Sequence, residues 1–266
     1  MFSIVASDLD GTLLSPNHRI TSYTKKTLRL LTMKGIHFIF ATGRHHIDVE
    51  KIKRKININS YMITSNGAKI HDNYGNLIYS HDINEEISFY LLKIVYKNKS
   101  IFTNIFRKNE WFVNRHYNNQ ENFFCESSFN YKIFSYKNFP INGIYKIYYT
   151  SSNYNNLIKL ENILNKKFGK KINVSFSSST CLEVMAGGVS KGNSLKYVSN
   201  ILGFTLKDCI SFGDGMNDKE MLKMSGKGCI MYNAEKKLKN ILPKLEVIGS
   251  NKDDAVSLYL NKMFFK

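Results

Sequence analysis

Short apolar runs that end at glycine-containing polar turns constrain the fold of this chain most strongly. These runs occupy residues 2–6, 36–41 and 209–212, and Asp-Leu-Asp-Gly, Thr-Gly-Arg and Gly-Asp-Gly turns follow them. Buried parallel strands read as continuous apolar runs, and in an open α/β sheet ligands bind where such strands end. The pattern predicts a parallel sheet whose polar loops gather at one edge.

Helical segments alternate with strands at both ends of the chain. Thr24, Thr27, Leu28 and Leu31 fall on one helical face, and Gly35 follows as a stop signal. Further helices are expected at 47–55, 190–202, 217–225, 234–242 and 253–264, strands at 61–64, 227–231 and 246–249, and a hairpin over 68–80. This alternation predicts a Rossmann-like, doubly wound parallel sheet with helices on both faces.

The middle of the chain has a different pattern. Two helices, 84–98 and 153–168, alternate with aromatic strands, which are expected at 101–108, 110–116, 143–150, 172–178 and 181–186. Paired strands that carry helices on one side are typical of an α+β unit. We therefore expect one core made of residues 1–83 and 187–266, with an α+β domain, residues 84–186, inserted into it.

The charge balance leaves a non-enzymatic alternative open. The formal net charge is +17, which can indicate a polyanion partner. Only six of the 38 basic residues are arginine, however, and nucleic-acid readers commonly use the arginine fork. Scattered lysines favour compositional drift, so no specific nucleic-acid partner is expected, although a polyanion binder stays an alternative.

Cysteine usage and hydropathy indicate a location. Cys125, Cys181, Cys209 and Cys229 are widely spaced without a CxxC pair, as is typical of free thiols in a reducing compartment. The N-terminal residues lack a signal-peptide pattern, and no run approaches the roughly 18 apolar residues of a membrane helix. We expect a soluble cytoplasmic protein with no membrane partner; no particular oligomeric state is indicated.

Four short strings carry residues suited to phosphate chemistry. Asp8 and Asp10 follow the first strand, where two acids can converge on Mg²⁺, although a bare pair of this kind is more often a solvated turn. Thr42 and Gly43 offer a hydroxyl and an N–H to a phosphate oxygen, and Lys191 offers a point charge at a helix start. The fourth string, Gly213-Asp214-Gly215-Met216-Asn217-Asp218, brings two more acids to a strand end. Glycine follows Lys191, which excludes a P-loop.

These four strings, in this order, resemble the haloacid dehalogenase-like hydrolase superfamily. Thr42 and Lys191 are 149 positions apart, and this interval holds the middle domain, as in the Cof-type branch of small-molecule phosphatases, which includes pyridoxal phosphate and sugar phosphatases. The resemblance runs essentially end to end. It implies a mobile cap domain that sets substrate choice, and a phosphatase that acts on a small phosphorylated metabolite with Mg²⁺ as cofactor.

The resemblance also implies a role for each motif residue. Asp8 is expected to be the nucleophile and Asp10 the general acid and base. Mg²⁺ is expected on Asp8, Asp214 and the backbone carbonyl of Asp10, with Asp218 supporting the metal shell or Lys191. The phosphoryl oxygens are expected to be held by Leu9 N–H, Thr42, Gly43 N–H, Lys191 and Asn217. An aspartate at position 10 favours a phosphatase over a dehalogenase, while a sugar phosphomutase of the same superfamily stays an alternative.

A few residues outside the motifs are candidates for contacts with the leaving group. Arg44 and His45 flank the phosphate loop, and Arg107, Trp111 and Arg115 lie on two adjacent strands of the expected cap. An aromatic ring beside cations suits a planar or hydroxylated group. The alternative for the strand residues is an ordinary sheet surface with a packed tryptophan, and for His45 an ordinary loop histidine.

Overall fold

The computed structural model describes residues 2–116 and 130–265, which form two compact units. Unit 1 comprises the residues up to Tyr79 together with those from Ser190 onward. Unit 2 comprises the continuous segment Ser80–Val189. The domain limits expected at 84 and 186 from the sequence pattern stay a prediction.

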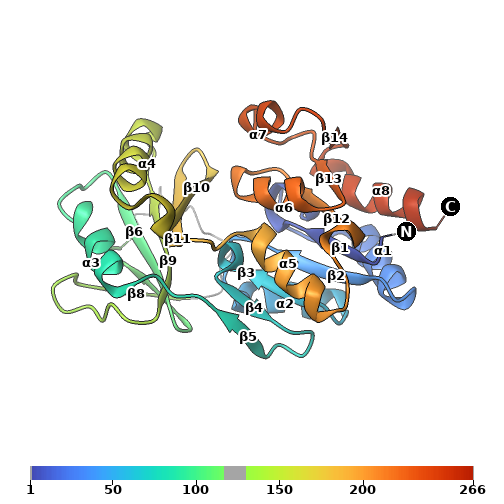
Figure 1. Cartoon of the computed structure of the whole chain (residues 1–266), viewed down its shortest axis with the longest axis horizontal. Coiled ribbons are helices and arrows are strands. Elements are labelled where there is room, and N and C mark those ends of the chain that lie inside the picture. Colours follow the sequence, from blue (N-terminus) through green and yellow to red (C-terminus); the bar gives the residue numbers. More distant parts are fainter. Residues whose placement is uncertain (1, 117–129, 266) are drawn as a thin grey trace. The chain divides into compact units, whose positions relative to one another are not determined.

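Unit 1 is built on a sheet of eight strands (Figure 1). Its strands, in spatial order, are β14 (Glu246–Val247), β13 (Lys227–Ile230), β12 (Cys209–Gly213), β1 (Ile4–Ser7), β2 (His37–Ala41), β3 (Tyr61–Thr64), β4 (Lys69–His71) and β5 (Leu77–Ser80). The strands from β14 to β3 are parallel, as predicted. β4 pairs antiparallel with β3, because only a short turn joins them and a parallel pair needs a long crossover.

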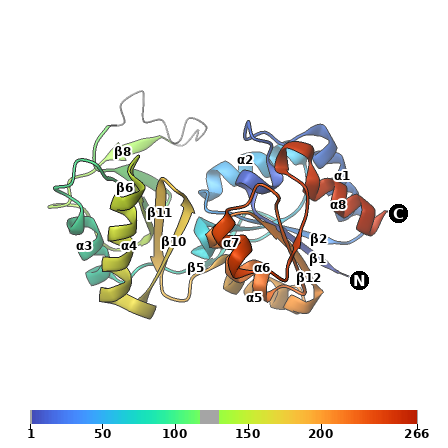
Figure 2. The same cartoon turned by 90° about the horizontal axis from the view of Figure 1, so that it is seen from above.

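Helices cover both faces of this sheet (Figure 2). They are α1 (Ser22–Met33), α2 (His46–Ile56), α5 (Lys191–Ile201), α6 (Lys219–Met224), α7 (Lys236–Ile241) and α8 (Ala255–Phe264). Strand side chains alternate in direction, so Val5 packs in the same buried cluster as Leu28 of α1 and Leu260 of α8, while Ile4 packs with Leu195 of α5. Each such side chain contributes about 1.5–3 kcal/mol through burial.

Local capping sets several helix starts. The Thr21 side chain accepts a hydrogen bond from Thr24 N and begins α1, and the Ser190 side chain accepts one from Asn193 N and begins α5. α6 starts two residues later than predicted, because Met216–Asp218 forms a separate 3₁₀ turn. β14 is shorter than the predicted strand over 246–249.

Unit 2 pairs a six-stranded sheet with two helices, α3 (Glu85–Ile94) and α4 (Tyr154–Phe168). Its strands, in spatial order, are β10 (Ile172–Ser178), β11 (Cys181–Ala186), β9 (Ile144–Thr150), β6 (Phe102–Arg107), β7 (Glu110–Val113) and β8 (Tyr131–Ile133). Among the described residues of this sheet, neighbouring strands pair antiparallel except β7 with β8, which are parallel. β8 is absent from the sequence prediction, and the strand predicted over 110–116 ends at Val113.

Two further expectations concern cysteines and membranes. Cys181, Cys209 and Cys229 are free thiols, while Cys125 lies outside the described residues. Across 2–116 and 130–265, no helix combines the length and the apolar character needed to cross a membrane.

Candidate active site

Asp8 lies at the carboxyl end of the central strand of unit 1. β1 is flanked by β12 and β2, and the Asp8 N–H donates to Phe212 O of β12 at 3.1 Å. This backbone bond extends the β1–β12 ladder by one residue and fixes where the side chain leaves the sheet. Asp8 is buried, with 7% of its surface exposed.

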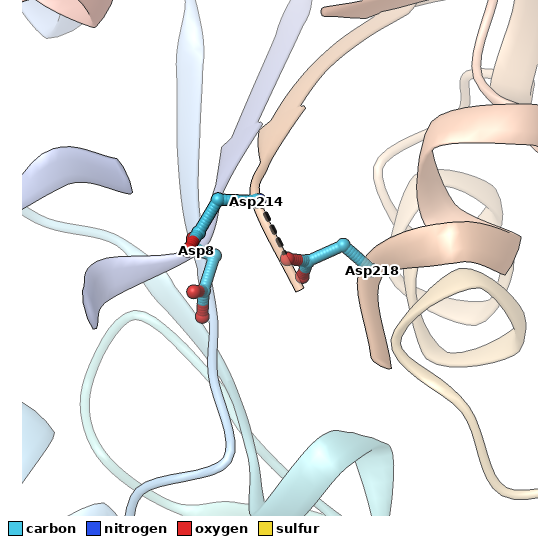
Figure 3. A group of neighbouring side chains, drawn as sticks. All are labelled: Asp8, Asp214 and Asp218. Carbon is cyan, nitrogen blue, oxygen red and sulfur yellow. Dashed lines mark hydrogen bonds between the residues drawn. The ribbon is translucent and has the colours of Figure 1, made fainter. Parts of the chain in front are cut away.

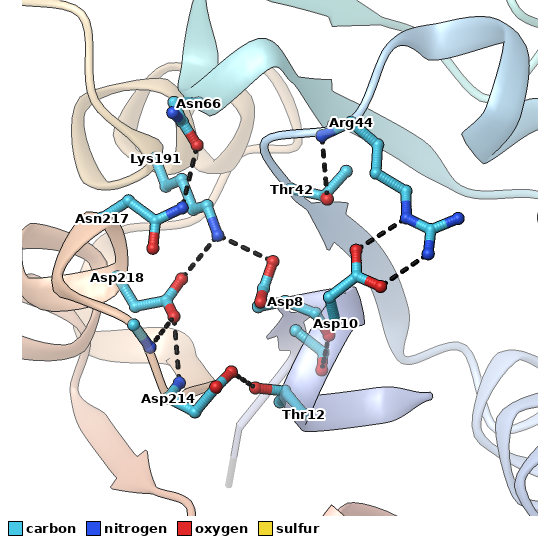
Figure 4. A network of polar contacts seen from close by, with 12 residues as sticks. Asp8, Asp10, Thr12, Thr42, Arg44, Asn66, Lys191, Asp214, Asn217 and Asp218 are labelled. Atoms are coloured by element: carbon cyan, nitrogen blue, oxygen red, sulfur yellow. Dashed lines mark hydrogen bonds and ion pairs between the residues drawn. The ribbon is translucent and has the colours of Figure 1, made fainter. Parts of the chain in front are cut away.

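Lys191 bridges two of the acidic residues (Figure 4). It is the first residue of α5 and is fully buried. Its Nζ donates to Asp8 Oδ1 and to Asp218 Oδ1, both at 2.7 Å. Burial lowers the pKa of Lys191, but the carboxylates of Asp218 and Asp8 outweigh this effect and raise the pKa, so the ammonium stays charged.

Asp8, Asp214 and Asp218 form a cluster in which one oxygen of each lies within 4.8 Å of the others (Figure 3). Burial raises the pKa of Asp8 well above its ordinary value; Lys191 opposes the shift, and Asp218 and Asp214 add to it. Burial and then the charge of Asp218 raise the pKa of Asp214 to about 7. When all three acids are ionised they share one ammonium and the cluster carries an excess of negative charge, which burial makes costly and which the raised pKa values of Asp8 and Asp214 reflect.

This excess and the all-oxygen donor set fit a hard divalent cation. The Asp214 carboxylate is oriented by the Thr12 hydroxyl, which donates to Oδ1 at 2.6 Å. Gly11 has φ +73°, and a Cβ on it would lie 2.2 Å from Asp214 Oδ2, so glycine is needed for the carboxylate to approach the β1 turn. Asp8 and Asp214 are the acids best placed to hold such a cation.

Asp218 is more fully engaged by donors than Asp8 or Asp214. Its Oδ1 accepts from Lys191, and its Oδ2 accepts from the backbone N–H groups of Asp214 and Gly215 at 3.0 and 2.9 Å. These bonds hold both Lys191 and the turn that carries Asp214. The arrangement is the one that the predicted supporting role requires, and that role stays a prediction.

The Asp10 side chain is held by Arg44 and His18. Arg44 Nε and Nη2 donate to the two carboxylate oxygens at 2.6 and 2.5 Å, and His18 Nδ1 lies 2.9 Å from Oδ1. Burial alone raises the pKa of Asp10, but hydrogen bonds from Arg44 and His18 outweigh burial and hold it far below its ordinary value. Arg44, expected as a leaving-group contact, is engaged with Asp10 in this structure.

The other predicted phosphate-binding residues lie on neighbouring loops of unit 1. Thr42 follows β2 and is buried, and its Oγ1 accepts from Arg44 N at 3.1 Å; Gly43 lies between them. Leu9 is fully buried in the turn after Asp8. Asn217 lies in the Met216–Asp218 turn and donates through Nδ2 to Asn66 Oδ1 at 3.1 Å.

The remaining candidates make contacts within their own units. His45 is buried at the start of α2, where its ring accepts from Ile47 N at 3.3 Å. Trp111 is buried in unit 2 and donates to Asn104 Oδ1 at 3.1 Å. Its burial agrees with the alternative of a packed tryptophan, and a contact with the leaving group stays a prediction.

Both arginines of the candidate group bind backbone oxygens of unit 2. Arg107 donates to the backbone and side-chain oxygens of Asn142, both at 2.8 Å. Arg115 donates to Ile101 O at 3.3 Å and to Lys99 O at 2.5 Å, and its guanidinium lies 3.7 Å from the centre of the Phe102 ring. These bonds fix loop backbone, and a contact of Arg107 or Arg115 with the leaving group stays a prediction.

Sequence reasoning missed three polar residues of this network, namely Thr12, His18 and Asn66. Thr12 stands inside the first motif, and its hydroxyl contact with Asp214 crosses 202 positions of sequence. Asn66 follows β3, a strand that the sequence predicts. Its position just after a parallel strand could have marked it as a candidate site residue. His18 carries no such signal.

Comparison with known proteins assigns the family. The model of haloacid dehalogenase-like hydrolases matches residues 5–260. The chain belongs to this hydrolase family. It is 48% identical over 268 residues to a protein of Buchnera aphidicola subsp. Schizaphis graminum that is named provisionally as a phosphatase, a match covering 100% of this chain and 97% of the relative. It is 36% identical to an HMP-PP phosphatase of Yersinia pestis, with coverage of 98% and 95%.

Solved structures of this hydrolase family share the fold. A sugar phosphatase of HAD subclass IIB superimposes with a TM-score of 0.84 at 21% identity, covering 98% of both chains. The predicted α/β architecture is thereby confirmed, as is the predicted family. The prediction of an enzyme of the phosphatase class is confirmed by the family and by its relatives.

Proposed function

We propose that this hydrolase is a Mg²⁺-dependent phosphatase of small phosphate monoesters and that Asp8 forms an aspartyl-phosphate intermediate. The observation that carries the proposal is the charge imbalance at Asp8, where Asp214 and Asp218 add negative charge and, among the described residues, Lys191 is the cation in contact with the cluster. Such a site favours a divalent cation together with a phosphoryl group. When bound, Mg²⁺ would neutralise the repulsion between the Asp8 carboxylate and an anionic substrate, with Asp8 and Asp214 as side-chain ligands.

The two chemical steps divide between Asp8 and Asp10. An oxygen of Asp8 attacks phosphorus, the bond from phosphorus to the leaving oxygen breaks, and a proton from Asp10 neutralises that oxygen. Water then attacks the aspartyl-phosphate, Asp10 takes its proton, and the bond between phosphorus and Asp8 breaks. Arg44 and His18 hold the pKa of Asp10 low in this structure, which favours the ionised carboxylate that the second step needs. The first step needs the protonated acid, so in this proposal the contacts with Arg44 and His18 give way and Asp10 takes up a proton when substrate binds.

Lys191 and the neighbouring loops have a binding role in this proposal. The Lys191 ammonium holds Asp8 Oδ1 in place and adds positive charge beside the phosphoryl group. Thr42, the Gly43 and Leu9 N–H groups and Asn217 would donate to phosphoryl oxygens. The segment 84–186 is proposed as the cap domain that selects the substrate, and the cytoplasm as the place of action.

Phosphate release from a metabolite panel tests the proposal. The panel holds pyridoxal 5′-phosphate, glucose 6-phosphate, HMP-PP and p-nitrophenyl phosphate, each assayed with Mg²⁺ and with EDTA. We expect metal-dependent release that Asp8→Asn lowers by about 10³-fold or more, because a missing nucleophile removes the covalent route. Asp82→Asn, the same substitution at an exposed residue of unit 2, is the matched control.

Two outcomes contradict the proposal. Release that persists in Asp8→Asn removes Asp8 as the nucleophile. Transfer of phosphate between sugar positions with little net release assigns the phosphomutase instead. Trapping of radiolabelled acyl-phosphate in Asp10→Asn, where hydrolysis of the intermediate is slowed, checks the covalent step directly.

A further inference from the structure

The turn Ser65–Gly67, directly after β3, has an unusual backbone. Ser65, Asn66 and Gly67 have φ angles of +49°, +57° and +99°. Asparagine tolerates the left-handed region and glycine is at ease there, but serine is not favoured. Such strained residues persist where the surrounding structure determines them, and they concentrate at functional sites.

Contacts with two predicted phosphate-binding loops hold this turn. Ser65 N donates to Arg44 O at 3.0 Å, and Asn66 N donates to Thr42 O at 2.9 Å. On the other side, Ser194 Oγ of α5 donates to Gly67 O at 2.9 Å. A Cβ on Gly67 would lie 2.5 Å from Ser190 O, so the turn packs directly against the start of the helix that carries Lys191.

The Asn66 side chain acts on Asn217 (Figure 4). Asn66 is buried, with 1% of its surface exposed, and its Oδ1 accepts from Asn217 Nδ2 at 3.1 Å. The Asn217 Oδ1 lies on the other side, 2.5 Å from where a Cβ of Gly215 would be. The oxygen and the NH₂ group of a carboxamide have nearly equal size, so shape alone does not fix the orientation of the Asn217 amide. The hydrogen bond to Asn66 turns its NH₂ group towards Asn66.

Among residues 2–116 and 130–265, the hydrogen bond of the Asn217 side chain is the one to Asn66, which uses one of the two N–H groups of the amide. We propose that Asn66 is a positioning residue, which holds Asn217 with the other N–H available to a phosphoryl oxygen. The inference rests on the proposed function, because it supplies that function with a hydrogen-bond donor. A bond to a charged acceptor that is lost in this way weakens binding about 10- to 100-fold.

A double-mutant cycle between Asn66 and Asn217 tests the proposal. Asn66→Gly accepts the positive φ and removes the acceptor, and Asn217→Ala removes the donor. The readouts are the Kd of inorganic phosphate in the presence of Mg²⁺, by calorimetry, and kcat/KM. We expect about a tenfold or larger loss for each single variant, and less than about a twofold further loss when Asn66→Gly is added to Asn217→Ala.

Thermal unfolding and a second variant separate positioning from folding. Asn66→Asp keeps an acceptor oxygen and the tolerance for positive φ, so Asn217→Ala should weaken phosphate binding by the same factor in this background as in the wild type. If Asn66→Gly does not fold, Asn66→Ala, which also removes the acceptor, takes its place in the cycle, with thermal unfolding as the check on folding. Additive losses, a wild type that binds no phosphate, or an Asn66→Asp background in which Asn217→Ala has no effect would overturn the inference.

The phosphate measurement also separates the two proposals. Coupled losses of phosphate affinity in an enzyme that hydrolyses no monoester would uphold the role of Asn66 and overturn the proposed reaction. Hydrolysis of monoesters with losses of phosphate affinity that are not coupled would uphold the proposed reaction and overturn the role of Asn66.

Discussion

Two buried lysines, Lys146 of unit 2 and Lys191 of unit 1, have different charge environments. In unit 2, Lys146 of β9 donates to Glu183 of β11 at 2.6 Å, and both side chains are almost fully buried. In unit 1, Lys191 contacts two carboxylates and a third lies close by. The first pair balances one charge with one, whereas the second group leaves negative charge uncompensated. A balanced pair serves the fold, while an unbalanced group is explained by a ligand that is positively charged.

The largest effect on stability is expected from breaking the balanced pair. Lys146→Met leaves the Glu183 carboxylate buried without its partner, which costs about 3–5 kcal/mol. The double variant Lys146→Met with Glu183→Leu should recover most of this loss, because replacing a buried pair by apolar groups is often neutral. Urea denaturation of the three proteins measures the free energy of unfolding. A single variant as stable as the wild type would show that the pair contributes little.

The two lysines also show what sequence could and could not predict. Lys191 was identified because it opens a helix in a recognisable order of motifs, beside residues that follow strand ends. Lys146 stands in the aromatic run Gly-Ile-Tyr-Lys-Ile-Tyr-Tyr-Thr, where periodicity predicts a strand but not a charge pairing with Glu183, 37 positions away. Local pattern determines element type, and partners across a sheet depend on register.

The same limit explains the other differences. The sequence does not predict β8, because within the described residues it pairs with the parallel strand β7 at the sheet edge, and no hairpin signal marks it. Asp10 was assigned to acid–base chemistry, whereas its pairing with Arg44 depends on how the turns after β1 and β2 face each other. Strand ends could be predicted from sequence, but the hydrogen bonds between neighbouring strand ends could not.

Removing one of the uncompensated charges around Lys191 should raise the stability of the metal-free protein, whereas breaking the Lys146–Glu183 pair lowers it. Burial and Asp218 raise the pKa of Asp214 to about 7, so in metal-free protein its ionisation costs stability increasingly as pH rises from 3.8 to about 7. Asp214→Asn removes that cost, and we expect a higher metal-free Tm at pH 8. Mg²⁺ at 100 times its Kd should stabilise the wild type by about 2.7 kcal/mol and the variant much less.

Thermal unfolding with Mg²⁺ and with EDTA measures both effects of Asp214→Asn, and Asp82→Asn serves again as the matched control. A lower metal-free Tm for Asp214→Asn would show that the charge of Asp214 does not destabilise the folded protein. An unchanged response to Mg²⁺ would show that Asp214 does not bind the ion.

A smaller effect on stability, one that depends on pH, is expected from two buried histidines that stay neutral. The rings of His46 and His71 stack with centres 4.5 Å apart beside Lys69, and burial lowers the pKa of each to about 4. Unfolded histidine binds a proton near pH 6.5, so the unfolded state holds more protons between pH 6.5 and 4. Stability is therefore complete above pH 6.5 and falls as pH drops towards 4.

His71→Phe keeps a ring in the stack and removes one of the two titrating groups. We expect it to reduce the loss of stability between pH 6.5 and 4 by about 1 kcal/mol, after allowance for partial exposure to solvent. Urea denaturation across this pH range measures the slope. An unchanged slope would assign the acid sensitivity to other titrating groups.

The smallest effect on the free energy of unfolding is expected from an ion pair at the protein surface. Lys227 Nζ lies 2.9 Å from Glu246 Oε2, a distance close to those of the buried pairs, but the side chains are 34% and 49% exposed. Water screens this pair, and exposed pairs contribute about 0.2–1 kcal/mol. Glu246→Gln should therefore lower the free energy of unfolding by less than about 1 kcal/mol, and less again in 1 M salt. A loss as large as that of Lys146→Met would mean that ion-pair distance, rather than burial, governs the cost, and the contrast between the two buried lysines would then lose its physical basis.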